Sequence, residues 1–168
     1  MRRILHRGRG EVTRRQDCYD SNMEILILVA FLAQPIPDPA TVDVCQRVPG
    51  AEVAKLFGKA LKQAKPFTSK DEFSRCTYLV TNPGSSETVV GYSLWFYPPE
   101  DYDELLEYTE GIVENPTGFG DAAVLFEDED GFSKLRLVVR GKFSLEAVAA
   151  DAESAKKLAK LGLERLSR

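Results

Sequence analysis

Histidine and cysteine are scarce in this sequence, with one and three copies among 168 residues. A catalytic cysteine needs a base, usually histidine, to form its thiolate. The single histidine, His6, lies in the Arg-rich N-terminal stretch, which excludes a Cys/His pair with Cys45 or Cys76. A zinc site takes about four Cys, His or carboxylate ligands at paired short spacings, and no such spacing occurs. We therefore predict no metal site and no cofactor.

Basic residues are absent from the middle of the chain. Between Arg75 and Lys134 there is no Lys or Arg, but thirteen Asp and Glu. The flanking segments are cationic, at +4 for residues 45–75 (7 basic, 3 acidic) and +5 for residues 134–168 (9 basic, 4 acidic). These blocks either neutralise one another in the fold or leave an acidic face for a basic partner or a cation. No Lys/Arg stripe of the kind that binds phosphates is present, so nucleic acid is not expected as a ligand.

Apolar runs long enough to cross a bilayer are also missing. The run MEILILVAFLA (residues 23–33) falls short of the roughly 20 residues required. With Arg-rich sequence before it, it predicts a signal or leader over residues 1–33, the alternatives being a core element or a true start at Met23. The Pro-spaced residues 34–44 predict a tether to a single domain over 45–168. We expect no stable transmembrane span, and association with the cell envelope only through the N-terminal segment.

The domain has the pattern of an α+β fold. Val53, Leu56 and Phe57 share one face of a helix expected over 48–58, which Gly58 ends. The order α-β-β-α-β-β-β-α predicts an antiparallel sheet of about five strands with helices packed on one face. The other expected elements are a basic connector over 59–73, strands over 76–81 and 88–97, an acidic helix beginning near Tyr102, strands over 121–127, 132–140 and 143–150, and a closing helix over 151–168.

The cysteine count indicates a disulfide. Removal of a leader takes Cys18 with it and leaves Cys45 and Cys76 as a pair, and an even count in an exported domain is typical of a disulfide. Two buried thiols are the alternative. The residues before Cys45 form no lipobox, so lipid attachment there is not expected.

The strand TVVGYSLWFY (residues 88–97) contains a candidate binding patch. If Tyr92, Leu94 and Phe96 face the core, then Trp95 and Tyr97 face the other way. Together with Tyr102 at the start of the acidic helix, these two aromatics predict a patch for a ligand or partner. The alternative is that a second helix covers that face.

Two glycine-containing loops suggest ligand sites but fit them poorly. Gly118, Gly120 and Asp121 precede a strand without a following Lys, unlike a phosphate-binding P-loop, and predict a structural turn instead. The acidic tip EDEDG (residues 127–131) lacks the acids that a calcium loop needs on either side, and predicts a solvated hairpin.

Acidic residues of the 100–114 region offer the main catalytic alternative. Two carboxylates held in a cleft are the requirement for glycosidase-type acid/base chemistry, and a charged solvent face is the competing interpretation. The candidate carboxylates are Asp101, Asp103, Glu104, Glu107 and Glu110.

Four segments together resemble one known group of proteins. CQRVPGAEVAKLFG, SRCTYLV, TGFGDAAVLF and LRLVVRGKFSLEAVA are similar, in order and spacing, to a family of bacterial secreted or lipoprotein-type domains of unknown function. Gly118, Phe119, Gly120, Asp121 and Ala123 resemble that family's Gly-hydrophobic-Gly-Asp-x-Ala signature. The resemblance covers residues 45 to about 166. It implies export, a disulfide and an extracytoplasmic binding or structural role, and it brings no known reaction.

The leading hypothesis is an exported, non-catalytic domain, secreted or held in the periplasm or cell envelope. Its partner would be a protein or a small ligand. The alternatives are a carboxylate-dependent hydrolase that uses acids of the 100–114 region, and a cytosolic interaction protein with reduced thiols.

Overall fold

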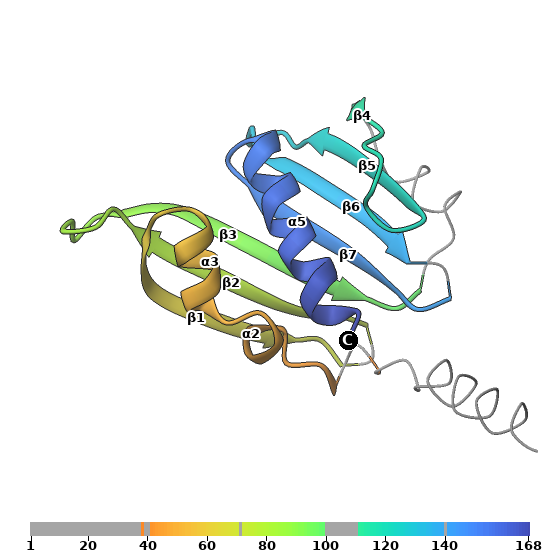
Figure 1. Cartoon of the computed structure of the whole chain (residues 1–168), viewed down its shortest axis with the longest axis horizontal. Helices are drawn as coiled ribbons and strands as arrows, with labels where there is room; N and C mark the ends of the chain where they lie inside the picture. The colour runs from red at the N-terminus through yellow and green to blue at the C-terminus, as the bar shows by residue number, and fades with distance from the viewer. Residues whose placement is uncertain (1–37, 39–40, 71, 100–110, 140) are drawn as a thin grey trace, which may run out of the picture. The chain divides into compact units, whose positions relative to one another are not determined.

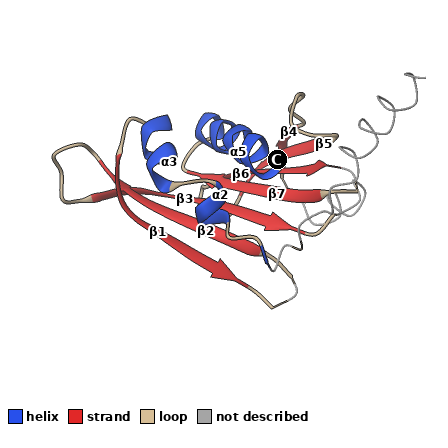
Figure 2. Cartoon of the chain, turned by 60° about the horizontal axis from the view of Figure 1, so that its bottom comes forward, coloured by secondary structure: helices blue, strands red, loops and turns tan. Residues whose placement is uncertain are grey.

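A computed structural model describes residues 38, 41–70, 72–99, 111–139 and 141–168 of the chain. Within these residues, an antiparallel sheet carries helices packed on one face (Figures 1 and 2). The α+β class predicted from the sequence is confirmed. The elements in chain order are α2 (Val44–Arg47), α3 (Gly50–Leu56), β1 (Ala60–Thr68), β2 (Ser74–Thr81), β3 (Thr88–Tyr97), β4 (Ile112–Glu114), β5 (Ala122–Glu127), β6 (Ser133–Val139), β7 (Phe143–Ala149) and α5 (Ala152–Leu166).

The described sheet has seven strands in the order β1-β2-β3-β7-β6-β5-β4, so the prediction of five was wrong. The two missed strands, β1 and β4, are the edge strands. Nearly every residue of β1 is exposed, and its partner register shifts between Leu61 and Gln63. A strand exposed on both faces lacks the alternation of apolar and polar residues that marks a half-buried strand. Pro66 suits an edge strand, since its missing N–H need not interrupt a ladder between two strands.

The helix predicted over 48–58 is found as α3, over Gly50–Leu56, and the short helix α2 before it was not predicted. Val48 has non-helical backbone angles (φ −119°, ψ 85°) between α2 and α3, and Pro49 follows as the N-cap of α3. A residue before proline is disfavoured in the helical region, which explains the break that the apolar spacing alone did not predict. At the other end Gly58 has a φ of +63° just beyond α3, which confirms the predicted stop. The acidic helix expected near Tyr102 lies outside the described residues.

The core lies between the helices and one face of the sheet. Tyr92, Leu94 and Phe96 are buried on that face of β3, as strand alternation predicts. The helix α5 approaches the sheet closely at Gly162, where a Cβ would lie 3.0 Å from a Leu94 methyl carbon. Glycine at this position thus allows backbone and sheet to meet without displacing core side chains. The core also includes Val42 and Val44, ahead of the boundary expected at residue 45.

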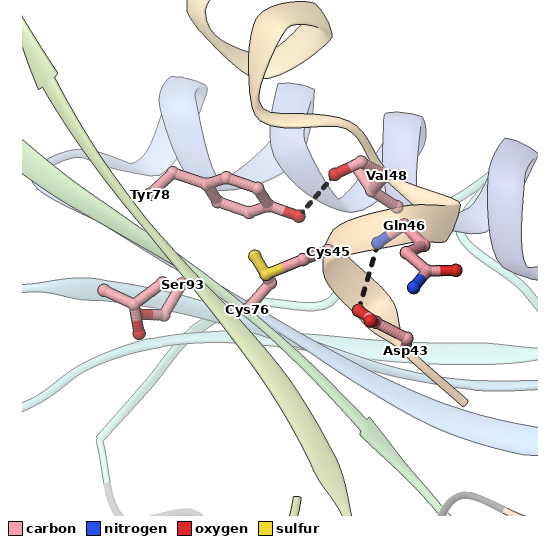
Figure 3. Close-up of a disulfide and its surroundings, with 8 residues drawn as sticks. Asp43, Cys45, Gln46, Val48, Cys76, Tyr78 and Ser93 are labelled. Atoms are coloured by element: carbon pink, nitrogen blue, oxygen red, sulfur yellow. Dashed lines mark hydrogen bonds between the residues drawn. A yellow bond between two sulfur atoms is a disulfide. The ribbon is translucent and has the colours of Figure 1, made fainter. Parts of the chain in front are cut away.

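A disulfide fastens α2 to β2. Cys45 and Cys76 are bonded, with their Cα atoms 5.1 Å apart (Figure 3). Beside this bond, the buried Tyr78 hydroxyl donates to the Val48 carbonyl at 2.9 Å. The Asp43 carboxylate accepts a hydrogen bond from the Gln46 amide at 3.1 Å and so caps α2. The predicted pairing of these two cysteines is confirmed, and it joins a four-residue helix, too short to be stable alone, to the second strand of the sheet.

Replacing Cys45 and Cys76 together by alanine is expected to lower the free energy of unfolding by about 3–4 kcal/mol, since the bond closes a loop across a sequence separation of 31 residues. Urea unfolding with and without reductant measures this. Cys18→Ser is the control and should unfold like the wild type. An oxidised wild-type protein whose midpoint does not move on reduction contradicts the prediction.

The buried Tyr78 makes the free energy of unfolding depend on pH in the alkaline range. Burial, and secondarily the Asp43 carboxylate, raise the pKa of Tyr78 above its ordinary value. The unfolded tyrosine ionises near pH 10 while the folded one stays neutral. The contribution is therefore complete below about pH 10 and declines as the pH rises further. Tyr78→Phe should unfold more easily at pH 8 but lose less stability between pH 9 and pH 11, as measured by urea unfolding. Equal pH slopes for the two proteins contradict this.

Candidate functional site

The sheet has a second face, opposite the one that the helices cover. No described helix packs on this second face (Figure 2). Alternation along β3 places Trp95 and Tyr97 there, because their neighbours Leu94 and Phe96 are buried under the helices. Arg75 lies on the same face of β2, since the next residue, Cys76, points to the helix side and is bonded to α2.

Backbone pairing aligns side chains of the second face into one row across the sheet. Phe67 is the register partner of Arg75, and Arg75 is the partner of Trp95. The row continues through Glu146 to Arg136. Directly paired residues have Cβ atoms about 4.5–5.5 Å apart, close enough for their side chains to touch. The row therefore alternates aromatic and charged side chains from Phe67 to Glu146 and ends on a second charged residue, Arg136.

Arg75 lies between two aromatic rings. Its guanidinium carbon is 4.3 Å from the ring centroid of Trp95 and 5.0 Å from that of Phe67. A guanidinium over an aromatic face is attracted by the ring quadrupole, by about 0.5–1 kcal/mol at an exposed site and about 2 kcal/mol when water is excluded. The two contacts restrict the rotamers of a side chain that is otherwise among the most flexible.

The aromatic contacts continue beyond Arg75. The rings of Trp95 and Tyr97 are parallel within 3°, with centroids 6.1 Å apart. Phe73 lies against both, at 5.0 Å from Trp95 and 5.6 Å from Tyr97. The guanidinium carbon of Arg136 is 4.9 Å from the centroid of the Tyr97 ring. We call this set the aromatic–arginine cluster, and its members are Phe67, Phe73, Arg75, Trp95, Tyr97 and Arg136.

The second face is accessible mainly over β1, β2 and β3. On β5 and β6 it is closed, since Val124 and Val138 form a small buried cluster there. By contrast Phe67 is 47% exposed, and Arg75 and Trp95 are partly exposed. The cluster thus lies on the accessible half of the face and borders the closed half at Arg136.

Arg75 has no acidic partner in the described part of the chain. No described carboxylate lies within ion-pair distance of its guanidinium, and its Nε, although buried, has no hydrogen-bond partner there. Arg165, in contrast, is bonded to Glu52 through both Nε (3.0 Å) and an NH2 nitrogen (2.8 Å). A buried N–H of a charged group without an acceptor costs free energy. Because this Nε is buried, the guanidinium donors left for an incoming acceptor are the terminal Nη groups.

Of the predicted patch, Trp95 and Tyr97 lie together on the second face, and Tyr102 lies outside the described residues. The sequence interpretation missed the arginines and both phenylalanines. Arg75 was overlooked because the strand was expected to begin at Cys76, whereas β2 begins at Ser74.

The predicted glycine turn precedes β5. Gly118 and Gly120 have positive φ values of 83° and 65°. A Cβ on Gly120 would lie 2.4 Å from the Val138 carbonyl oxygen, and the Asp121 amide donates to that same oxygen at 2.8 Å. Residues 115–123 line an open pocket of about 390 Å³, in which Asp121 is the one ionisable group among the described lining residues.

The acidic hairpin tip organises its own turn. Asp128 accepts hydrogen bonds from the Phe132 amide at 2.8 Å and the Asp130 amide at 3.1 Å, and pairs with Lys134 at 3.1 Å. Burial works to raise the pKa of Asp128, but these hydrogen bonds and the Lys134 ammonium hold it below its ordinary value. Across the described residues, no three His, Cys, Asp or Glu side chains lie close enough together to hold a metal ion.

The structure describes one carboxylate of the 100–114 region on which the hydrolase hypothesis depends. The carboxylates between residues 101 and 110 lie outside the described residues. Glu114, at the end of that region, is described, and its carboxylate lies 2.7 Å from the Lys156 ammonium. The hydrogen bond to Glu114 raises the pKa of Lys156. Glu114 is thus engaged in an ion pair between β4 and α5.

Among the described residues, no helix has the length and apolar character needed to cross a membrane. No family model, curated protein or solved structure matches the chain.

Gly118→Ala and Gly120→Ala form a matched pair for testing the turn. Both place a Cβ at positive φ, which costs roughly 1–2 kcal/mol. Gly118 has open space around it, whereas Gly120 faces the Val138 carbonyl. We expect Gly120→Ala to be the more destabilising by at least about 1 kcal/mol in urea unfolding. Equal losses for the two variants contradict a packing role for Gly120.

Proposed function

We propose that this protein is an exported, non-catalytic module that binds an acidic partner protein on the second face of its sheet. The observation that carries the proposal is the aromatic–arginine cluster, in which the Arg75 guanidinium lies over the rings of both Phe67 and Trp95 without a described acidic partner. The cluster lies on the accessible half of a face that no described helix covers.

The residue types of the cluster favour protein recognition. Trp, Tyr and Arg are the residues most enriched among those that dominate the binding energy of protein interfaces. Here Trp95 contacts both Arg75 on the adjacent strand and Tyr97 on its own strand, and the paired strands hold the three with little freedom. Side chains that are already ordered lose less entropy when a partner binds.

The charge of the accessible half determines the kind of partner. The charged side chains that strand register places on it are Lys65 and Arg75, both basic, and Lys62, in the bulge of β1, is basic as well. Arg136 adds a third cation at the border, where its register partner is Glu146. A cationic surface with aromatic side chains is complementary to an acidic segment that also carries apolar side chains.

Export is supported by the disulfide and by the expected leader. Disulfides persist in oxidising compartments and are rare in the cytosol. The Cys45–Cys76 bond closes between two parts of the described fold that are far apart in sequence, and the Arg-rich stretch with the apolar run 23–33 precedes it. The resemblance to secreted and lipoprotein-type domains points the same way.

Mass spectrometry of the protein from its native host tests export. We expect an oxidised Cys45–Cys76 pair and a mature chain that lacks the leader. An intact Met1 together with a free Cys45 thiol would overturn this part of the proposal.

Site-specific photo-crosslinking in the native host tests the binding surface. The probe is p-benzoylphenylalanine at Thr77, which lies beside Ser93 on the second face with their hydroxyl oxygens 3.2 Å apart. The control is the same probe at Lys160, an exposed residue of α5 on the helix side. We expect a discrete adduct from position 77 only, to an acidic protein, and its loss in a Trp95→Ala background. Equal adducts from both positions, or a position-77 adduct unaffected by Trp95→Ala, would contradict the proposal.

A further inference from the structure

Resting on the proposed function, we infer that Arg75 is a receptor for one carboxylate of the partner, an Asp or Glu side chain in an acidic peptide segment. The carboxylate binds the terminal N–H groups of the guanidinium while the rings of Phe67 and Trp95 hold the guanidinium in place. Arg75 is thus the anchor of the interface.

The position of the two rings leaves the N–H groups of the Arg75 guanidinium as the part that a ligand can bind. A guanidinium is planar, and it offers its faces to aromatic rings and its edges, with five N–H donors, to acceptors. The Arg75 guanidinium carbon lies 5.0 Å from the ring centroid of Phe67 and 4.3 Å from that of Trp95. With the guanidinium lying over both rings and its Nε buried, the terminal N–H groups are what remains for recognition. A carboxylate fits this fork with two parallel hydrogen bonds.

The neighbouring row of the sheet leaves room beside Arg75. Thr77 follows Arg75 on the same face of β2, and its register partner is Ser93 of β3. Both side chains are small, partly exposed and end in hydroxyl groups. Because one hydroxyl donates to the other, the pair keeps one O–H donor for an acceptor next to the guanidinium. Lys65, the register partner of Thr77 on β1, places a second cation in the same row.

A single carboxylate suits this surface better than a nucleic-acid backbone. Binding to a chain of phosphates depends on many Lys and Arg contacts spread along a groove. Strand register places two basic residues, Lys65 and Arg75, on the accessible half of the second face, and the row of Arg75 continues to Glu146. One bidentate arginine flanked by aromatic side chains instead matches one carboxylate set among apolar residues.

The fluorescence of Trp95 can report on ligand binding at Arg75. Trp95 is the single tryptophan of the chain, and its ring lies 4.3 Å from the Arg75 guanidinium carbon. A carboxylate that binds Arg75 changes the field and the cation contact at this ring. Tryptophan emission therefore reports on the proposed site without a label.

The test is a fluorescence titration of the oxidised full chain with poly-L-glutamate. We expect a saturable change in Trp95 emission that weakens at about 0.3 M salt. Arg75→Gln should weaken binding by about tenfold or more, and Arg75→Lys should weaken it severalfold, because a lysine keeps the charge but not the fork. Lys160→Gln, which removes one charge on the helix side, should stay within about twofold of the wild type. Near-UV circular dichroism verifies that each variant is folded.

Several outcomes would overturn the inference. These are wild-type affinity in folded Arg75→Gln, equal affinity in Arg75→Lys and wild type, or tighter binding of a single-stranded oligonucleotide or of inorganic phosphate than of poly-L-glutamate. Poly-L-glutamine, which lacks the carboxylates, should not bind.

The failures of the two proposals are distinguishable. A Trp95-dependent adduct at Thr77 combined with unchanged poly-L-glutamate binding in Arg75→Gln rejects the carboxylate receptor and keeps the binding surface. Arg75-dependent binding of poly-L-glutamate without any adduct in the host rejects the proposed partner protein and keeps the receptor.

Discussion

The alternation of side chains along β2 is the constraint on which the rest of the structure depends. Cys76 points to the helix side and is bonded to Cys45. This bond fixes the direction of Cys76, and strand alternation then sets the face on which each of the remaining β2 residues lies. Arg75, one position earlier, is therefore directed to the second face. A shift of one residue in this strand would bury the guanidinium and expose the sulfur atom. The covalent bond that holds the fold and the proposed binding contact are thus neighbours in sequence and are fixed by one backbone conformation.

Strand pairing extends this constraint across the sheet. Because β1, β2 and β3 pair side by side, Phe67, Arg75 and Trp95 share one row although they are separated in sequence by a turn on each side of β2. Their order is set by backbone hydrogen bonds rather than by attraction between the side chains. This is why we regard the cluster as preorganised: the sheet contributes the positions, and the side chains need to lose little further freedom on binding. The same pairing separates the accessible half of the face from the half closed by Val124 and Val138.

The sequence predicted the parts of the fold that bury one face and missed those that do not. The bounds of β3 were predicted correctly at 88–97, and α5 was predicted within two residues at each end, since each has a clear apolar stripe. The edge strand β1 is exposed on both faces and gave no periodic signal. The contact of Arg75 with Trp95 depends on strand register, which is determined by pairing over long sequence distances and is not encoded in the local pattern of either segment. The disulfide was predictable because it followed from cysteine parity rather than from geometry.

The outer edge of β1 has a consequence for the behaviour of the protein in concentrated surroundings. An unprotected sheet edge templates the addition of strands from other molecules, which leads to aggregation. On β1, Lys62 falls at the register shift, Lys65 adds a second charge, and Pro66 withholds an N–H group. Each of these features opposes strand addition. The edge that β1 presents to other molecules is therefore a poor template for a further strand, which favours a dispersed protein over a fibril at high concentration.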